Sequence, residues 1–202
     1  MRHLLLGILL ISVISGCTSL PPVPETQAPV RSWQENTQWL EQQTEWAIKG
    51  KIGIRQDQQV TSANLSWEQQ YNDYRIFMSG PFGQGAVDIR GNEQGIVLKI
   101  SGDETYYATS PEALLQDQLG WSLPLSNLDY WVKGLPAPTE PYIKTLDERN
   151  LLKTLEQNSW KIQYRSYHWD QTVPLPHKII LTQGQFLKVT LVVKEWSLNN
   201  QI

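Results

Sequence analysis

Apolar and polar residues alternate with a period of two along most of the chain from residue 46 onward. In segment 46–55, four apolar side chains fall on one face and the basic residues fall on the other, which is the pattern of a strand with one buried face. Segments with the same pattern follow at 62–67, 74–78, 87–89, 96–100, 106–108, 160–164, 177–182 and 186–193. The short connections between them, such as 69–73 and 91–95, indicate antiparallel neighbours.

Three segments carry helix signals instead. A serine at position 32 can cap a helix over 33–44, whose apolar positions are only loosely periodic. Ser-Pro-Glu at 110–112 supplies a capping hydroxyl, a proline at the first helical position and an acid near the positive end of the helix dipole. This predicts a helix that ends at the glycine after residue 119, and a third short helix over 126–133 also ends at a glycine. Segment 151–157 fits either a helix or a strand.

About nine or ten strands with two or three short helices predict a mainly β fold of the α+β class. An antiparallel sheet of this size curls strongly, so we expect an open barrel or half-barrel with helices against its concave face. Such a barrel encloses either its own side chains or a ligand, and periodicity does not distinguish these two cases.

The first seventeen residues carry export signals. An apolar run over 4–14 follows a basic start; it has the length of a signal-peptide core and is too short to span a bilayer as a helix. Residues 14–17, Ile-Ser-Gly-Cys, resemble the bacterial lipobox, in which the cysteine is acylated and becomes the first residue after cleavage. Cys17 is the only cysteine in the chain, so it has no disulfide partner. We therefore expect a signal peptide over 1–16 and lipidation at Cys17.

The region after the cysteine resembles a tether. Four prolines lie between residues 20 and 30, so we expect 17–31 to be a lipidated N-terminus with an extended linker and 32–202 to be one domain. Lipoproteins with aspartate after the cysteine tend to stay in the inner membrane, and this chain has Thr18 there. The expected location is therefore the outer membrane, with the lipid-anchored chain facing the periplasm.

Composition and charge argue against most other function classes. A formal net charge of -3 gives no long-range attraction to nucleic acid. His168 and His177 lie in loop or edge contexts without a second ligand at metal spacing, and the neighbouring acids at 103–104 and 147–148 point in different directions. We therefore expect no enzyme activity, no cofactor and no metal. Nine tryptophans fit either a large apolar interior or a lipid-facing role.

A tryptophan-containing segment carries a family resemblance. Residues 124–136, PLSNLDYWVKGLP, match the pattern P-L-x-x-L-x-x-W-x-x-G-L-P. Weaker matches support it, namely Gly50-Lys51 in the first strand, Ser66-Trp67, Trp160 with Tyr164, and Leu175-Pro176. Together with the lipobox, they make nearly the whole chain similar to the LolB family, outer-membrane receptors that take lipoproteins from the periplasmic carrier LolA.

The resemblance implies an unclosed antiparallel barrel with helices as a lid over an apolar cavity. That cavity holds the acyl chains of a cargo lipoprotein, so the implied partners are LolA, cargo lipoproteins and outer-membrane lipid, and we expect a monomer. The candidate residues for the acyl-chain cavity come from the alternating strands and from the helical lid. The strands supply Trp46, Ile48, Ile52, Ile54, Leu65, Trp67, Ile76 and Met78, and the lid supplies Leu128 and Trp131.

The glycine-rich segment 79–85, SGPFGQG, has an apolar residue where a turn usually carries a polar one. In the LolB family, a leucine in a Pro-Leu-Gly context protrudes from a loop between strands and promotes delivery into the membrane. Pro81, Phe82 and Gly83 occupy that place here, so the resemblance implies a membrane-insertion loop with phenylalanine at its tip. The alternative to a receptor is an adaptor lipoprotein with a solid β core.

Overall fold

The computed structural model describes residues 30–80, 85–101, 104–120, 123–138, 140–169 and 173–198. These residues form one antiparallel sheet of eleven strands in the order β6-β5-β4-β3-β2-β1-β11-β10-β9-β8-β7. The strands are β1 (Glu45–Gln56), β2 (Gln59–Gln70), β3 (Asp73–Ser79), β4 (Val87–Asn92), β5 (Gly95–Ile100), β6 (Glu104–Ala108), β7 (Tyr142–Leu146), β8 (Leu152–Gln157), β9 (Trp160–His168), β10 (Leu175–Gln183) and β11 (Leu187–Leu198). The predicted mainly β architecture is confirmed.

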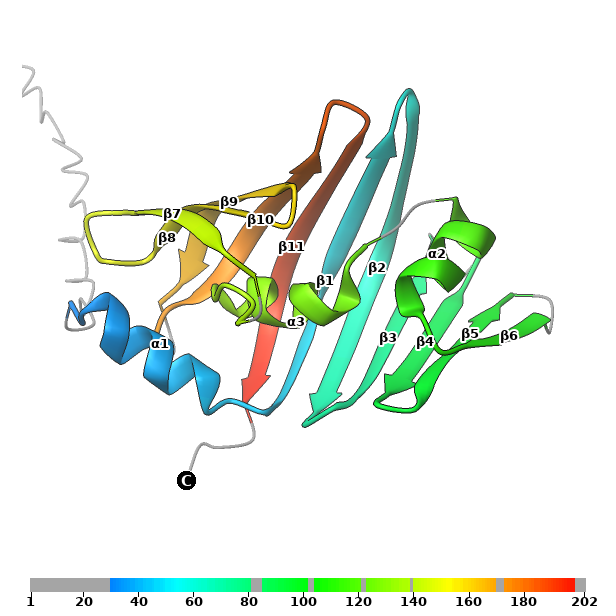
Figure 1. Ribbon diagram of the computed structural model, residues 1–202, viewed down its shortest axis with the longest axis horizontal. Helices are drawn as coiled ribbons and strands as arrows, with labels where there is room; N and C mark the ends of the chain where they lie inside the picture. Colours follow the sequence, from blue (N-terminus) through cyan, green and yellow to red (C-terminus); the bar gives the residue numbers. More distant parts are fainter. Residues whose placement is uncertain are drawn as a thin grey trace, which may run out of the picture.

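The first and last strands of the domain meet at the centre of the sheet. β1 pairs with both β2 and β11, whereas all other neighbours in the sheet are also consecutive in sequence. The sheet therefore consists of two meanders joined along β1 and β11. Among the described residues its edge strands β6 and β7 do not pair with each other, so the sheet is open, as predicted (Figure 1).

Three helices lie among the described residues: α1 (Trp33–Glu41), α2 (Pro111–Leu119) and α3 (Leu125–Lys133). Each of the first two begins at a serine that accepts a hydrogen bond from a backbone N–H of the first turn, and α2 and α3 end at glycines in the left-handed conformation. α2 and α3 lie against one face of the sheet (Figure 1). α1 instead packs beside the start of β10, where its Leu40 contacts Leu175 and Val173.

The structure shortens one predicted helix, resolves one ambiguous segment and adds one strand that was not predicted. α1 ends at Glu41 rather than at residue 44, and the ambiguous segment 151–157 contains strand β8. β7 was not predicted, because its Tyr142 and Ile143 are adjacent apolar residues that are both exposed, and an edge strand with this pattern lacks alternation.

The pleat of the strands separates an apolar face from a polar one. We call the face that α2 and α3 contact the helix-covered face and the other the outer face. In β1 the helix-covered face carries the four apolar residues predicted from alternation, each at most 8% exposed. Only a glycine fits at position 50, since a Cβ there would lie 2.1 Å from the Val192 carbonyl oxygen. At this point the pairing of β1 with β11 is interrupted, because Lys194 forms a bulge in β11.

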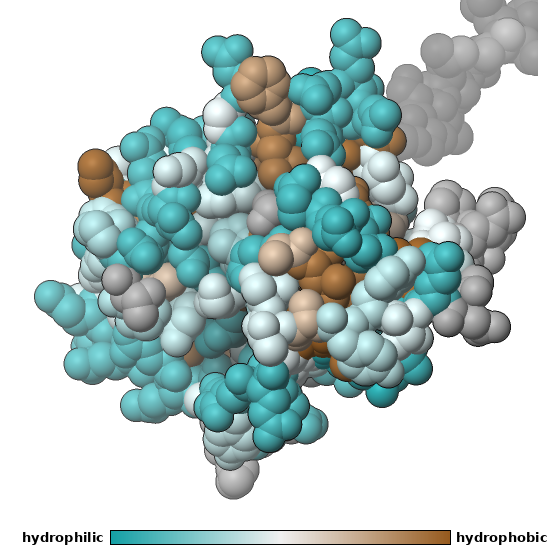
Figure 2. Space-filling view, turned by 45° about the vertical axis from the view of Figure 1, so that its right-hand side comes forward, coloured by the Kyte–Doolittle hydropathy of each residue, from teal (hydrophilic) through white to brown (hydrophobic). Residues whose placement is uncertain are grey.

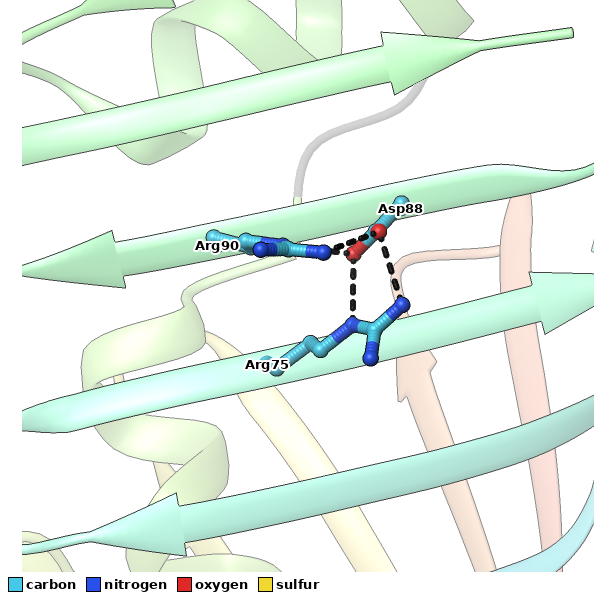
Figure 3. A network of polar contacts seen from close by, with 3 residues as sticks. All are labelled: Arg75, Asp88 and Arg90. Carbon is cyan, nitrogen blue, oxygen red and sulfur yellow. Dashed lines mark hydrogen bonds and ion pairs between the residues drawn. The ribbon is translucent and has the colours of Figure 1, made fainter.

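The outer face carries charged side chains that pair across strands. The Asp88 carboxylate of β4 accepts hydrogen bonds from Arg75 on β3, at 3.0 Å, and from Arg90, at 3.0 and 3.4 Å (Figure 3). Burial opposes ionisation of Asp88, but the two guanidinium groups outweigh this effect and lower its pKa. This face is therefore built to remain in contact with water.

Several predicted features lie outside the described residues. These are the signal peptide, the lipidation site Cys17 and most of the tether, together with the loop residues Pro81, Phe82 and Gly83. In the part of the chain that the structure describes, no helix has the length and apolar character needed to cross a membrane.

Candidate functional site

The structure places all ten predicted interior residues in one apolar cluster between the sheet and the helices α2 and α3, which we call the lid helices. Eight come from β1, β2 and β3 and two from α3, and each is at most 8% exposed. Leu114 and Leu115 of α2 belong to the same cluster. The burial of these residues agrees with their predicted orientation, and their predicted contact with acyl chains remains a prediction.

A small void lies at the centre of this cluster, with a volume of about 30 Å³. Every side chain that borders it is apolar. The lining residues are Ile52, Leu65, Trp67, Ile76, Met78, Ile89, Leu115, Leu123, Leu125, Leu128, Leu181, Val189 and Leu191. Six of the ten predicted residues are among them, whereas Trp46, Ile48, Ile54 and Trp131 are buried farther from the void.

The size of the void decides what this conformation can hold. A space of about 30 Å³ has room for roughly one water molecule, whereas pockets for small ligands measure about 300–1,000 Å³. The interior is therefore nearly filled by its own side chains. An acyl chain can enter only if part of the cover moves away from the sheet.

The molecular surface also exposes apolar side chains on the side of the lid. Figure 2 shows a group of hydrophobic side chains in the right half of the view, surrounded by hydrophilic ones. Several apolar residues that pack against the core cluster are only partly buried, including Val87, Ile100 and Leu119. The apolar interior thus reaches close to solvent near α2 and the neighbouring strands.

α3 is held to the sheet by buried hydrogen bonds at its C-terminal end. The indole Nε1 of Trp131 donates to Gln157 Oε1 at 2.8 Å, and the hydroxyl of Tyr164 donates to the carbonyl oxygen of Trp131 at 2.8 Å. All three side chains are at most 6% exposed. Because a buried polar group that loses its partner is costly, these bonds fix the position of α3 on the sheet.

Sequence reasoning missed several residues that line the void, and it also missed the polar residue Gln157. Its Oε1 also accepts from the backbone N–H of Ala137 at 2.8 Å, and its Nε2 donates to the carbonyl oxygens of Ala137 and Glu140 at 2.7 and 2.8 Å. The side chain thereby ties the segment after α3 to β8. The available signal was a polar residue at a buried position of a strand, two residues after the core residue Leu155.

A buried lysine adds another contact at the same end of α3. Lys133 is 6% exposed, and its ammonium group lies 3.4 Å from Asp129 Oδ1 and 3.4 Å from the carbonyl oxygen of Gln43. It also lies over the rings of Tyr130 and Trp46, at 5.4 and 5.9 Å from their centroids. Burial raises the pKa of Asp129, and the neighbouring lysine only partly opposes this shift.

α2 is attached much less firmly. Leu114 and Leu115 pack into the core, and the helix contacts β5 and β6 near the edge of the sheet. Among the residues that the structure describes, one side-chain hydrogen bond joins this helix to the sheet, from Gln56 Nε2 to the carbonyl oxygen of Gly120 at 2.8 Å, and it is exposed to solvent. α2 is therefore the part of the cover that can move at the lowest cost.

His168 and His177 lie next to each other in the sheet. The expectation of loop or edge contexts was wrong, because His168 ends β9 and His177 lies in the neighbouring strand β10, with their ring centroids 4.7 Å apart. The ring nitrogens contact Val193 O and Ser166 Oγ at 2.9 and 3.0 Å. Within the described ranges, no group of three or more His, Cys, Asp or Glu side chains could hold a metal ion.

The acidic pair at 147–148 contributes to a turn. Asp147 Oδ1 accepts hydrogen bonds from the backbone N–H groups of Arg149 and Leu151, both at 2.9 Å. This carboxylate satisfies the backbone between β7 and β8. Its geometry therefore indicates a structural role for Asp147.

Comparison with known proteins agrees with this architecture. A family model described as "Outer membrane lipoprotein LolB" matches residues 44–196. The chain is 38% identical over 193 residues to the outer-membrane lipoprotein LolB of Chromohalobacter salexigens, an alignment that covers 96% of this chain and 89% of the relative. It is 42% identical over 188 residues to that of Pseudomonas aeruginosa, covering 92% and 91%.

Solved structures with low sequence identity share the fold. A LolA superfamily protein from Nitrosomonas europaea superposes with a TM-score of 0.52 at 9% identity, over 85% of this chain and 96% of the other. A DUF1329 family protein from Desulfovibrio piger gives a TM-score of 0.56 at 7% identity, over 86% and 95%. The open sheet with short helices on one face thus occurs in chains of very different sequence.

Proposed function

Because the chain belongs to the LolB family of outer-membrane lipoproteins, we propose that it is a receptor that delivers other lipoproteins to the outer membrane. In this proposal it accepts cargo from the periplasmic carrier LolA, holds the acyl chains between the sheet and the lid helices, and inserts them into the membrane. The observation that supports it most is the apolar interior beneath α2 and α3, whose void has an entirely apolar lining.

The physical need for such an interior follows from the cargo. A triacylated lipoprotein carries three chains of about sixteen carbons, and exposing them to water costs tens of kcal/mol at about 0.8 kcal/mol per methylene. The chains must therefore pass from one apolar site to the next. Transfer runs in the direction of stronger binding, from the carrier to this receptor and then to the bilayer.

Loading requires the interior to open, since the void measures only about 30 Å³. The unequal attachment of the two lid helices indicates how this happens. α3 keeps its buried hydrogen bonds to Gln157 and Tyr164, while α2 breaks one exposed bond to Gln56 and moves away from the sheet. Leu115 of α2 then leaves the interior and makes room for the acyl chain.

Attachment and release are assigned to two sites outside the described residues. Acylated Cys17 anchors the chain facing the periplasm, and Phe82, between Pro81 and Gly83, contacts lipid during release. Transfer of one phenylalanine side chain into lipid yields about 1.5 to 3 kcal/mol, which is enough to orient a docked receptor but not to anchor it. None of these steps requires catalysis, a cofactor or a metal.

The proposal is tested with the mature chain, from position 17 onward, carrying Cys17→Ala so that it stays free of lipid. A fluorescent fatty-acyl probe should bind this chain, and cargo should move to it from lipoprotein-loaded LolA. Phe82→Glu should leave both steps intact and impair release into liposomes. Unchanged release by that variant would remove the loop from the mechanism.

The nearly filled interior favours a second candidate, an adaptor lipoprotein that uses the sheet as a solid structural core. In that case the folded chain should neither bind the acyl probe nor take cargo from LolA, while its melting temperature stays that of an intact domain. Probe binding that displaces α2 distinguishes the receptor from the adaptor.

A further inference from the structure

Seven strands of the sheet end along one line. One residue inside these ends, cross-strand partners form a continuous row across the sheet. Val60 of β2 pairs with Arg55 of β1, Arg55 pairs with Lys188 of β11, and the row continues to β7. Its remaining members are Thr182, Lys161, Glu156 and Ile143. We call this row, together with Phe186 in the adjoining turn, the hairpin rim. The turns β1–β2 and β10–β11 at this edge project beyond the lid helices (Figure 1).

The rim exposes three large apolar side chains. Val60 is 72% exposed, Phe186 is 70% exposed and Ile143 is 69% exposed. The β1–β2 turn next to Val60 and the β10–β11 turn that holds Phe186 are joined, because the backbone N–H of Asp57 donates to the carbonyl oxygen of Phe186 at 2.9 Å. Single exposed apolar side chains are common on protein surfaces, so what distinguishes the rim is the kind of residue that lies beside these three.

Basic side chains lie between these apolar residues. Arg55 is exposed and Lys188 is partly exposed, and they are direct cross-strand neighbours. Lys161 lies two strands farther along the row and pairs with Glu156 at 3.0 Å. An open hollow of about 590 Å³ lies beside Lys161 and Ile143. The rim thus combines exposed apolar contacts with cations and with room for a polar group.

This combination suits a lipid surface better than a protein partner. A stable protein interface buries roughly 800 Å² on each side in a continuous, complementary patch, whereas the rim offers separate apolar side chains on projecting turns. Apolar side chains that enter the acyl boundary, flanked by Lys and Arg that meet anionic headgroups, are typical of membrane contact.

The position of the rim in the chain allows this contact. β3 runs toward the rim, since Asp73 pairs with Gln70 and Ser79 with Asn64 of β2, so the loop after β3 starts on the side of the rim. Twelve residues lie between Cys17 and Val30, and the thirteen Cα–Cα steps span at most about 45 Å when extended. The twelve-residue strand β1, at roughly 3.3 Å per residue, has about the same length as this extended segment. A chain anchored at Cys17 can therefore place its rim on the membrane.

We propose that the hairpin rim is a second lipid-contact surface, in which Arg55, Lys161 and Lys188 bind anionic phospholipid headgroups while Phe186 and Val60 enter the bilayer interface. This inference rests on the proposed delivery of cargo to a membrane. It concerns the docked orientation of the receptor and is independent of the acyl-chain interior.

The test uses the mature chain carrying Cys17→Ala and two kinds of vesicle: phosphatidylethanolamine with phosphatidylglycerol, and phosphatidylcholine alone. The starting chain should bind the anionic vesicles more tightly. Arg55→Gln with Lys188→Gln should weaken binding to them about 30-fold, from two charges at about 1 kcal/mol each. Equal affinity of the starting chain for both vesicles would overturn the proposal.

A matched control variant changes the net charge by the same amount at a different place. Lys51 and Lys178 are exposed on the same outer face and both pair with Val192, four residues from the rim along β1. At about 13 Å from the rim they lie beyond the Debye length at physiological salt, so Lys51→Gln with Lys178→Gln should change binding less than threefold. An equal loss from the control pair would show an unspecific charge effect and overturn the proposal.

The apolar part of the rim is tested separately. Phe186→Ser should weaken binding to the anionic vesicles about tenfold, while Tyr107→Ser, at a residue that is 75% exposed on β6, should leave it unchanged. Acyl-probe binding should be the same in all these variants, which separates failure of the rim from failure of the receptor function. If Phe82→Glu alone abolishes vesicle binding and the rim variants bind normally, the contact lies in the loop and the rim proposal is wrong.

Discussion

The two helices that cover the sheet have the same length but very different attachments. α3 is joined to the sheet by buried hydrogen bonds from Trp131 and Tyr164, and its Lys133 is buried beside Asp129. α2 contributes leucines to the same core, yet its hydrogen bond to the sheet is exposed to solvent. Buried polar bonds define a fixed position, whereas apolar packing at the edge of a sheet permits displacement.

In the proposed loading of acyl chains, this difference gives the two helices separate tasks. α3 keeps the apolar face of the sheet closed on one side and provides a fixed wall. α2 lies over the open edge near β5 and β6, where displacement exposes the void without breaking a buried hydrogen bond. The variants Gln157→Ala, Tyr164→Phe and Asp129→Asn alter the attachment of α3. The variant Gln56→Ala alters the attachment of α2.

The largest effect is expected from Gln157→Ala. It leaves the indole N–H of Trp131 and the backbone N–H of Ala137 buried without their partner. Two such groups cost roughly 4 kcal/mol of the free energy of unfolding, which urea denaturation measures. Gln70→Ala, at an exposed residue that ends β2, is the control and should change stability by less than about 0.5 kcal/mol. A loss as small as that of the control would show that Gln157 does not hold α3.

A smaller loss is expected from Tyr164→Phe, which removes one buried hydroxyl and leaves the carbonyl oxygen of Trp131 without this donor. The expected cost is about 1 kcal/mol in the same denaturation experiment. Tyr107→Phe, which alters an exposed hydroxyl, should have no measurable effect. Burial raises the pKa of Tyr164 above the ordinary tyrosine value of 10.0, so above that pH the unfolded chain loses this proton while the folded chain keeps it, and the stability difference from the Phe variant should shrink as pH rises.

Asp129→Asn should change the pH dependence of stability. Burial raises the pKa of Asp129 above its ordinary value of 3.8, so the folded chain binds this proton more tightly than the unfolded chain does. Its contribution to the free energy of unfolding therefore falls as pH rises through the interval between the two pKa values. The variant should lack this decrease in a series of melts from acidic to neutral pH; an unchanged series would contradict the assignment.

The smallest effect on stability is expected from Gln56→Ala, which removes the exposed bond to Gly120. The free energy of unfolding should change by less than about 0.5 kcal/mol, but the acyl probe should bind faster in stopped-flow fluorescence because α2 is released more easily. Gln58→Ala, at an exposed turn residue, is the control. Equal rates for all three chains would show that the bond to Gly120 does not limit opening.

Much of the fold could be predicted from the sequence because each signal is local. Alternation placed Ile48 and Trp67 on the buried face, and a capping serine and a terminal glycine marked α2. The open sheet follows from hydrophobic patterning and short connections. β7 escaped prediction, because an exposed edge strand needs no apolar alternation.

The parts of the site that could not be predicted depend on contacts between distant residues. Gln157 and Trp131 are 26 positions apart, and the two histidines meet only because β9 and β10 are neighbours. The basic residues looked scattered along the chain, yet the register of the strands brings Arg55 beside Lys188. The volume of the void likewise depends on how side chains of both lid helices pack together.

The central claim is that the interior opens by displacement of α2 while α3 stays in place. With Cys17→Ala the chain has no other cysteine, so spin labels can be placed at Gln116 of α2 or Ser126 of α3, each with a reference label at Ser62 on β2, and all three residues are exposed. When the fatty-acyl probe binds, the Gln116–Ser62 distance should increase and the Ser126–Ser62 distance should stay the same. Probe binding with both distances unchanged, or with α3 moving as far as α2, would contradict the account.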